Sequence, residues 1–223
     1  VYKRQMLVSA MYNIVDQIFI GQGVGMLGNA ATNVAFPVTT IATALALLLG
    51  IGGASNYNLE MGAGQEKKAS GIAGTALSSL VISGLILAVI ALVFLKPLLT
   101  LFGATTDVMP YAVAYTGITA LGLPFYILSV GGNHVVRADR SPTYSMTCIM
   151  IGAIINTILD PVFIFVFGWG IKGAAWATVI GQVVSGVLVI VYFWKFRNMY
   201  LTGAMLKPKM PYLKAIISVS YTH

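Results

Sequence analysis

Long apolar runs, separated by short clusters of charged residues, restrict the fold of this chain more than any other feature of its sequence. The run at about 69–95, for example, contains no charged side chain. A hydrocarbon core about 30 Å thick needs roughly 20 apolar residues for one helical crossing. Lipid offers no partner for backbone N–H and C=O groups, so such runs cross as helices, and the alternation typical of barrel strands is not seen in them. The sequence therefore predicts an all-α membrane protein.

The composition excludes a soluble domain and argues against a nucleic-acid binder. Of the 223 residues, 58% are hydrophobic and only 9% are charged, whereas soluble domains carry about 25% charged residues. The mean hydropathy is +0.87. The net charge of +7 comes from Lys and Arg clusters between apolar runs, and a nucleic-acid binder would instead present a continuous basic face. We expect membrane lipid, and no nucleic acid, as a partner.

The spacing of the charged clusters predicts six transmembrane spans. We expect these spans to form one lobe over residues 1–197. The expected spans lie at about 6–22, 30–57, 69–95, 109–131, 143–167 and 174–194. For residues 198–223 we expect a basic cytoplasmic linker, followed by the start of a truncated seventh helix. Because the chain lacks an initiator Met and ends inside an apolar run, we expect a fragment of a longer protein.

The distribution of Lys and Arg predicts that the N-terminus is cytoplasmic. That orientation places eleven of the thirteen basic residues on the cytoplasmic side and leaves only Lys96 and Lys172 outside. Such a split agrees with the positive-inside rule, and the opposite orientation would invert it. We therefore expect a multi-pass protein of the cell membrane.

Two acidic residues, Asp16 and Asp160, lie inside expected spans, whereas Asp139 falls in the polar turn after the fourth span. A carboxylate near the bilayer centre costs roughly 2.5 to 3.5 kcal/mol on insertion scales and usually faces a cavity or a partner. No Lys or Arg lies within these spans to act as that partner. The sequence therefore predicts that a transient cation balances the two acids: a proton, a metal ion or a cationic solute.

Polar neighbours lie one helical turn before each acid. Tyr12 precedes Asp16 by four residues, and Asn156 precedes Asp160 by the same interval, so each pair shares one helix face. Tyr and Asn can donate to a carboxylate, and an amide oxygen can share a hard cation with it. If the two faces meet, the carboxylates repel each other, which favours proton uptake by the pair.

A structural role for Asp160 is the alternative interpretation. An acid followed by a proline, as in Asp160–Pro161, is typical of a helix start, with the acid as N-cap. Only six residues would then follow before the sequence GWG, which is too short to cross a membrane. The sequence therefore favours a span that continues through a kink at Pro161.

Two segments resemble the multidrug and toxic compound extrusion (MATE) family of transporters: YNIVDQIFIGQ at 12–22 and NTILDPVFIFVFGWGIKGAAWATVIGQ at 156–182. The order of six spans, with a short basic loop after the second, is also similar to that family. The resemblance covers about 6–197 and implies two six-helix lobes around a cleft that opens alternately to each side. This chain is similar to the N-terminal lobe alone, so the missing C-terminal lobe is an expected partner.

The resemblance also implies a function and a site. It implies export of amphipathic, often cationic organic compounds in exchange for protons or sodium ions, with no cofactor. By position, Asp16 and Asp160 match the acidic cation-site residues of the N-terminal lobe, and Tyr12, Asn156 and Thr178 match the polar groups around them. A sodium ion would be held by Asp16, Asp160, Asn156 and Thr178.

Other functions remain open at the level of sequence. A flippase for lipid-linked oligosaccharides, from the same superfamily, would need cationic side chains for pyrophosphate, and these spans contain none. An ion channel or a membrane scaffold would show no coupled transport. We do not expect an enzyme, because neither a metal-ligand cluster nor a nucleophile and base pair accompanies the acids.

Overall fold

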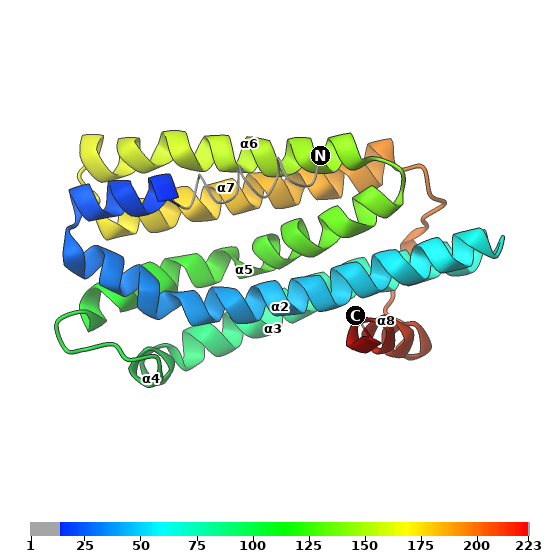
Figure 1. Ribbon diagram of the computed structural model, residues 1–223, viewed down its shortest axis with the longest axis horizontal. Coiled ribbons are helices and arrows are strands. Elements are labelled where there is room, and N and C mark those ends of the chain that lie inside the picture. Colours follow the sequence, from blue (N-terminus) through cyan, green and yellow to red (C-terminus); the bar gives the residue numbers. More distant parts are fainter. Residues whose placement is uncertain (1–13, 223) are drawn as a thin grey trace. The chain divides into compact units, whose positions relative to one another are not determined.

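The computed structural model describes residues 14–222, and every regular element in that range is a helix or a helical turn. After a first helix, described over 14–23, the elements are α2 (Met26–Gly62), α3 (Glu66–Val93), α4 (Leu95–Leu101), α5 (Met109–Ala138), α6 (Pro142–Pro161), the π-helical turn η1 (Val162–Val166), α7 (Ile171–Val191), the π-helical turn η2 (Tyr192–Phe196), the 3-10 turn η3 (Gly203–Leu206) and α8 (Met210–Thr222) (Figure 1). The predicted all-α fold class is confirmed.

Five of the described helices are long and apolar enough to cross a membrane. They are Met26–Gly62, Glu66–Val93, Met109–Ala138, Pro142–Val166 and Ile171–Lys195. Each of them overlaps one of the second to sixth predicted spans. The first predicted span, at 6–22, is described only from residue 14, and Tyr12 therefore lies outside the described residues.

The turn between α2 and α3 is shorter than the polar sequence around it suggests. Both helices extend into that polar sequence, so Glu60 and Lys68 are helical. Their side chains form an ion pair with 2.7 Å between Oε1 and Nζ. Only residues 63–65 form the turn, and Gly64 has a φ of +74°, which a residue with a Cβ rarely adopts. The ion pair and this glycine allow the helices to continue past the apolar runs.

The chain divides into two compact units. Unit 1 comprises Val1–Ile41, Ile86–Leu123 and Ile149–Val184, and unit 2 comprises Ala42–Leu85, Pro124–Cys148 and Ser185–His223. In unit 1, the first helix packs against η1 and the start of α7 through a core of Ile20, Ile164, Ile171 and Ala174. The ring of Phe19 meets that of Phe165 edge-on, with 6.3 Å between centroids. This packing holds the first helix one turn beyond Asp16.

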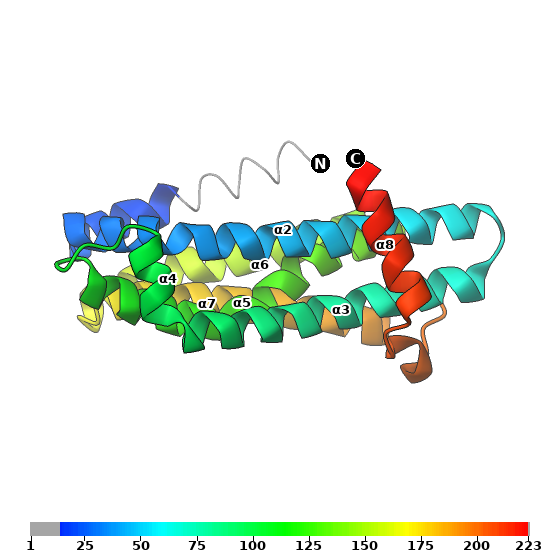
Figure 2. The ribbon, with the colours of Figure 1, turned by 90° about the horizontal axis from the view of Figure 1, so that it is seen from below.

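In unit 2, the helices approach closely at small residues. A Cβ added to Gly50 of α2 would lie 2.5 Å from the carbonyl oxygen of Gly131 in α5, so these two backbones are in direct contact. The C-terminal helix α8 crosses α2 and α3 (Figure 2). At that crossing, Asn56 Nδ2 donates to the carbonyl oxygen of Ala215 at 3.1 Å. The segment after α7 is therefore attached to the helices of unit 2.

Asp139 lies in the turn between α5 and α6, and it is buried there. Its side chain is 2% exposed. Oδ2 accepts hydrogen bonds from the hydroxyl of Tyr192 and the backbone N–H of Asn198, both at 2.7 Å. Oδ1 accepts from the hydroxyl of Tyr57 at 3.2 Å. Asp139 thus joins α2, the α5–α6 turn, η2 and the linker that follows η2.

Candidate functional site

The first helix and α6 bring the two predicted acids together in unit 1. Asp160 is fully buried and Asp16 is 8% exposed. The two carboxyl groups are close enough to act on each other. The core around Ile20 and Ile164 explains this proximity, because it holds these segments together one turn beyond each acid. The helix faces that carry Asp16 and Asp160 therefore meet, which is the arrangement that the sequence analysis considered.

Three of the four carboxyl oxygens of this pair are buried and receive no hydrogen bond from the described residues. Both oxygens of Asp160 and Oδ1 of Asp16 are buried and have no donor in that part of the chain. Over the same residues, the charged group that acts on each carboxyl is the other acid, and no Lys, Arg or His takes part. Burying an ionised carboxylate is costly unless a positive charge or hydrogen-bond donors compensate it. The pair therefore has the chemistry of a site for a cation or a proton.

Asn156 and Thr178 lie together beside this pair. Asn156, one turn before Asp160 on α6, is 3% exposed, and its Nδ2 donates to Thr178 Oγ1 of α7 at 3.5 Å. Its Oδ1 is buried and has no donor among the described residues. With Nδ2 turned to Thr178, Oδ1 is left as a free acceptor of the kind that a hard cation such as sodium binds.

Close contact between α6 and α7 positions these polar groups (Figure 1). A Cβ added to Gly181 would lie 2.8 Å from the carbonyl oxygen of Gly152 and 3.1 Å from Cβ of Asn156. Glycine at this position therefore lets α7 approach the polar face of α6. A larger residue would push Thr178 away from Asn156.

The chain continues as a helix beyond Asp160. α6 ends at Pro161, and η1 extends the helical path through Val166 with wider, π-type turns. Asp160 therefore lies near the end of a long span and does not begin a new helix, in agreement with the interpretation that the sequence favoured. Proline lacks the backbone N–H of a regular helical turn, and π-type turns occur frequently at functional sites.

Gln182 is a polar residue near this site that the sequence interpretation missed. It follows Thr178 by one turn of α7, and its Oε1 is buried without a donor among the described residues. Its side chain reaches the backbone of α5 at Gly122, where an added Cβ would meet Oε1. The four-residue spacing from Thr178 could have identified it, since that spacing defines a shared helix face.

Comparison with known proteins gives a consistent set of relatives. The MatE family model matches residues 4–162. The multidrug export protein MepA of Staphylococcus haemolyticus (strain JCSC1435) is 31% identical over 191 residues, which cover 84% of this chain and 41% of that protein. The multidrug export protein MepA of Staphylococcus aureus (strain MRSA252) is 28% identical over 214 residues, which cover 96% of this chain and 48% of that protein.

Solved structures agree with these relatives. The outward-facing conformation of a multidrug resistance MATE family transporter of the MOP superfamily has a TM-score of 0.88 and 28% identity, over 97% of this chain and 48% of that chain. A crystal structure of MATE in the bent conformation has a TM-score of 0.89 at 28% identity, over 97% of this chain and 49% of that one. The chain thus spans about half the length of the relatives that it matches.

These matches and the apolar helices define the class of this protein. Its relatives are transporters, and it is a multi-pass membrane protein. Because the family model covers residues 4–162, which is more than half of the sequence, the chain belongs to the MatE family.

Proposed function

We propose that this chain supplies the N-terminal lobe of a two-lobe transporter that exports amphipathic, often cationic organic compounds in exchange for protons or sodium ions. The observation that carries the proposal is the buried pair of Asp16 and Asp160, in which three of the four carboxyl oxygens lack donors within the described residues. A pair of acids at membrane depth requires a compensating charge. A cation that arrives and leaves supplies that charge without a fixed partner. The relatives named as multidrug export proteins support the class of substrate.

Exchange at the shared acids explains how transport would be driven. When both carboxyls are ionised, the pair attracts a cationic compound that enters from the cytoplasmic side. When a proton or a sodium ion from the other side neutralises the pair, that attraction is lost and the compound leaves. One elementary charge that moves inward across 100 mV releases about 2.3 kcal/mol, which supplies energy for export.

The other residues of the site have separate roles in cation binding and in movement of the first helix. Oδ1 of Asn156 and Oγ1 of Thr178 would provide neutral oxygen ligands for a sodium ion, in addition to the carboxylates. The first helix carries Asp16 and contacts Ile164 of η1 through Ile20. A shift of this helix would change the separation of the two carboxyls. Binding at the pair and repacking of the first helix are therefore linked.

The placement in the membrane is part of the proposal. We place the protein in the cell membrane with its N-terminus in the cytoplasm, because this orientation puts the basic turns and the linker on the cytoplasmic side. The second lobe, which forms the other wall of the cleft, would lie outside this chain. A flippase for lipid-linked pyrophosphate is disfavoured, because the buried acid pair would repel an anionic substrate.

Efflux from vesicles tests this function. The complete protein is reconstituted into vesicles, and efflux of the cationic dye ethidium is followed under an imposed proton gradient, an imposed sodium gradient and no gradient. We expect efflux that depends on one of the two gradients and stops when an ionophore removes it. Dye flux that is equal with and without gradients, accompanied by an ionic conductance, would instead identify a channel.

A further inference from the structure

Unit 2 contains an apolar groove, of about 580 Å³, that the transport mechanism does not use. We call it the unit 2 groove. Its floor is formed by the buried side chains of Leu77 and Val189, from α3 and α7. Its walls carry exposed apolar side chains, among them Val81, Ile190 and Trp194. The volume is in the range of about 300–1,000 Å³ that is typical of ligand pockets.

The linker after α7 forms one wall of the unit 2 groove and is fixed in place there. The hydroxyl of Ser78 on α3 donates to the carbonyl oxygen of Gly74 at 2.9 Å and also to that of Leu206 in η3. The backbone N–H of Lys209 donates to Oγ1 of Thr75 at 3.4 Å. Gly74 allows the linker to lie directly on α3, since an added Cβ would collide with the carbonyl of Met205. The groove is therefore a built feature of the fold.

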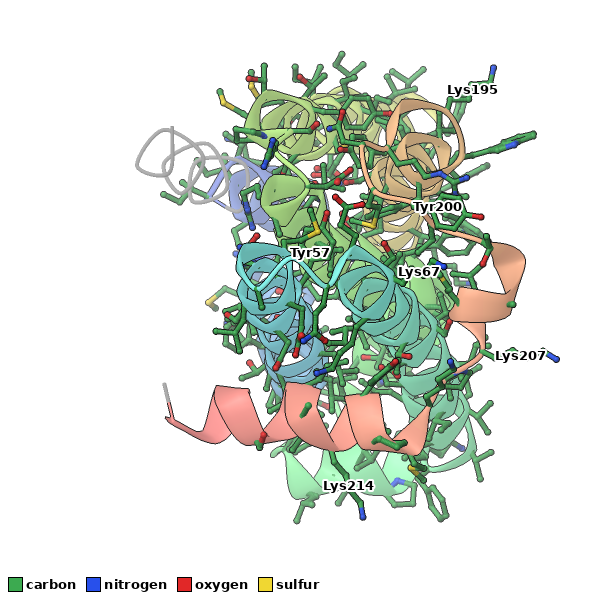
Figure 3. All side chains as sticks on the ribbon, turned by 90° about the vertical axis from the view of Figure 1, so that its right-hand side faces the viewer. Tyr57, Lys67, Lys195, Tyr200, Lys207 and Lys214 are labelled. Carbon is green, nitrogen blue, oxygen red and sulfur yellow. The ribbon has the colours of Figure 1, made fainter. Side chains whose placement is uncertain are left out.

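The charged residues at and beside the unit 2 groove are basic. Among the residues that the structure describes, Arg197 is the single charged one that lines it. Lys195 and Lys207 are exposed on either side of Arg197 in sequence, and both extend outward from the segment between α7 and α8 (Figure 3). Trp194, which lies next to them, is 76% exposed, and such aromatic rings favour the boundary between lipid and water. The groove thus combines an apolar channel with a basic entrance at the membrane surface.

This combination matches one class of ligand. Basic pockets between transmembrane helices bind anionic headgroups, and an acyl chain suits an apolar channel with exposed aliphatic walls. We propose that the unit 2 groove binds an anionic phospholipid, with one acyl chain along Val81 and Ile190 and the phosphate at Arg197. A cationic drug does not fit the same groove, because no acid lines it and Arg197 would repel the drug. The proposal does not depend on the transport function.

Lipid binding to the purified protein, with its native flanking sequence, tests the proposal. Native mass spectrometry measures the affinity for phosphatidylglycerol and for phosphatidylethanolamine with identical acyl chains. We expect tighter binding of phosphatidylglycerol, and a loss of about fivefold or more in Arg197→Gln, since a basic residue near the surface contributes about 1 kcal/mol. Affinity for phosphatidylethanolamine should fall less in that variant, because its ammonium group offsets the charge of its phosphate. Val81→Trp, which fills the groove, should weaken the binding of both lipids.

Lys214→Gln provides the matched control for charge. Lys214 is exposed on α8 and does not line the groove, so its removal should leave the affinity for phosphatidylglycerol unchanged. Equal losses in Lys214→Gln and Arg197→Gln would reveal diffuse attraction and overturn the proposal. Wild-type affinity in Arg197→Gln would also overturn it. If Val81→Trp lowers the melting temperature in detergent, the Arg197→Gln comparison alone decides.

Discussion

Replacing Asp160 with asparagine should abolish gradient-driven efflux, so that the rate falls to that of vesicles without protein. The substitution keeps the size of the side chain but removes the carboxyl group that binds a proton or a sodium ion in the proposed mechanism. Because both carboxyl oxygens are buried and lack donors among the described residues, the amide should not weaken folding by breaking an existing contact. Efflux of ethidium from reconstituted vesicles measures the effect. Asp16→Asn should give the same loss, because the proposed exchange uses both carboxyls as one site.

Asp107→Asn is the matched control for this experiment. Asp107 is exposed in the segment between α4 and α5, so the same chemical change there should leave efflux at the wild-type rate. The melting temperature in detergent should be close to that of the wild type for all three variants. Coupled efflux at the wild-type rate in either Asp16→Asn or Asp160→Asn would refute exchange at the pair.

The second large effect concerns stability and arises at Asp139. Asp139→Ala would remove an acceptor shared by three donors: the hydroxyls of the buried Tyr57 and Tyr192 and the backbone N–H of Asn198. Hydrogen bonds to a charged group contribute about 1.5–3 kcal/mol each, and these losses are only partly additive. We expect a destabilisation of about 3–5 kcal/mol. This corresponds to a fall in melting temperature on the order of 10 °C.

Thermal unfolding in detergent, followed by circular dichroism, measures this change. The exposed Asp107 again supplies the control, since Asp107→Ala should shift the melting temperature very little. Asp139→Asn keeps an oxygen acceptor and should lie between Asp139→Ala and the wild type. An unchanged melting temperature in Asp139→Ala would show that these hydrogen bonds do not stabilise unit 2.

The burial of Asp160 could be predicted from the sequence, whereas the burial of Asp139 could not. Asp160 interrupts a long apolar run, so its burial and its cost follow from local composition. Asp139 lies among polar residues, and its burial depends on partners that are distant in the chain. Tyr57 and Tyr192 lie 82 and 53 residues away from it. The residues next to Asp139 in the sequence give no indication of these contacts.

Other features also arise only in three dimensions. The helical character of the apolar runs follows from the chemistry of lipid, which leaves no alternative for the backbone. The π-helical turn after Pro161 and the folding of the linker onto α3 depend on packing between segments. The position of Gln182, by contrast, follows from its four-residue spacing to Thr178, which places both side chains on one face of α7.

The most direct test of the acid pair counts the ions that leave when a cationic ligand arrives. Binding of tetraphenylphosphonium to the complete protein in detergent is measured together with the release of protons, by calorimetry in buffers of different ionisation enthalpy, and of radiolabelled sodium. The exchange mechanism predicts that binding releases protons or sodium ions, and that the double variant Asp16→Asn with Asp160→Asn releases neither. Binding of the ligand to the wild type without release of either ion, or with the same release in the double variant, would contradict it.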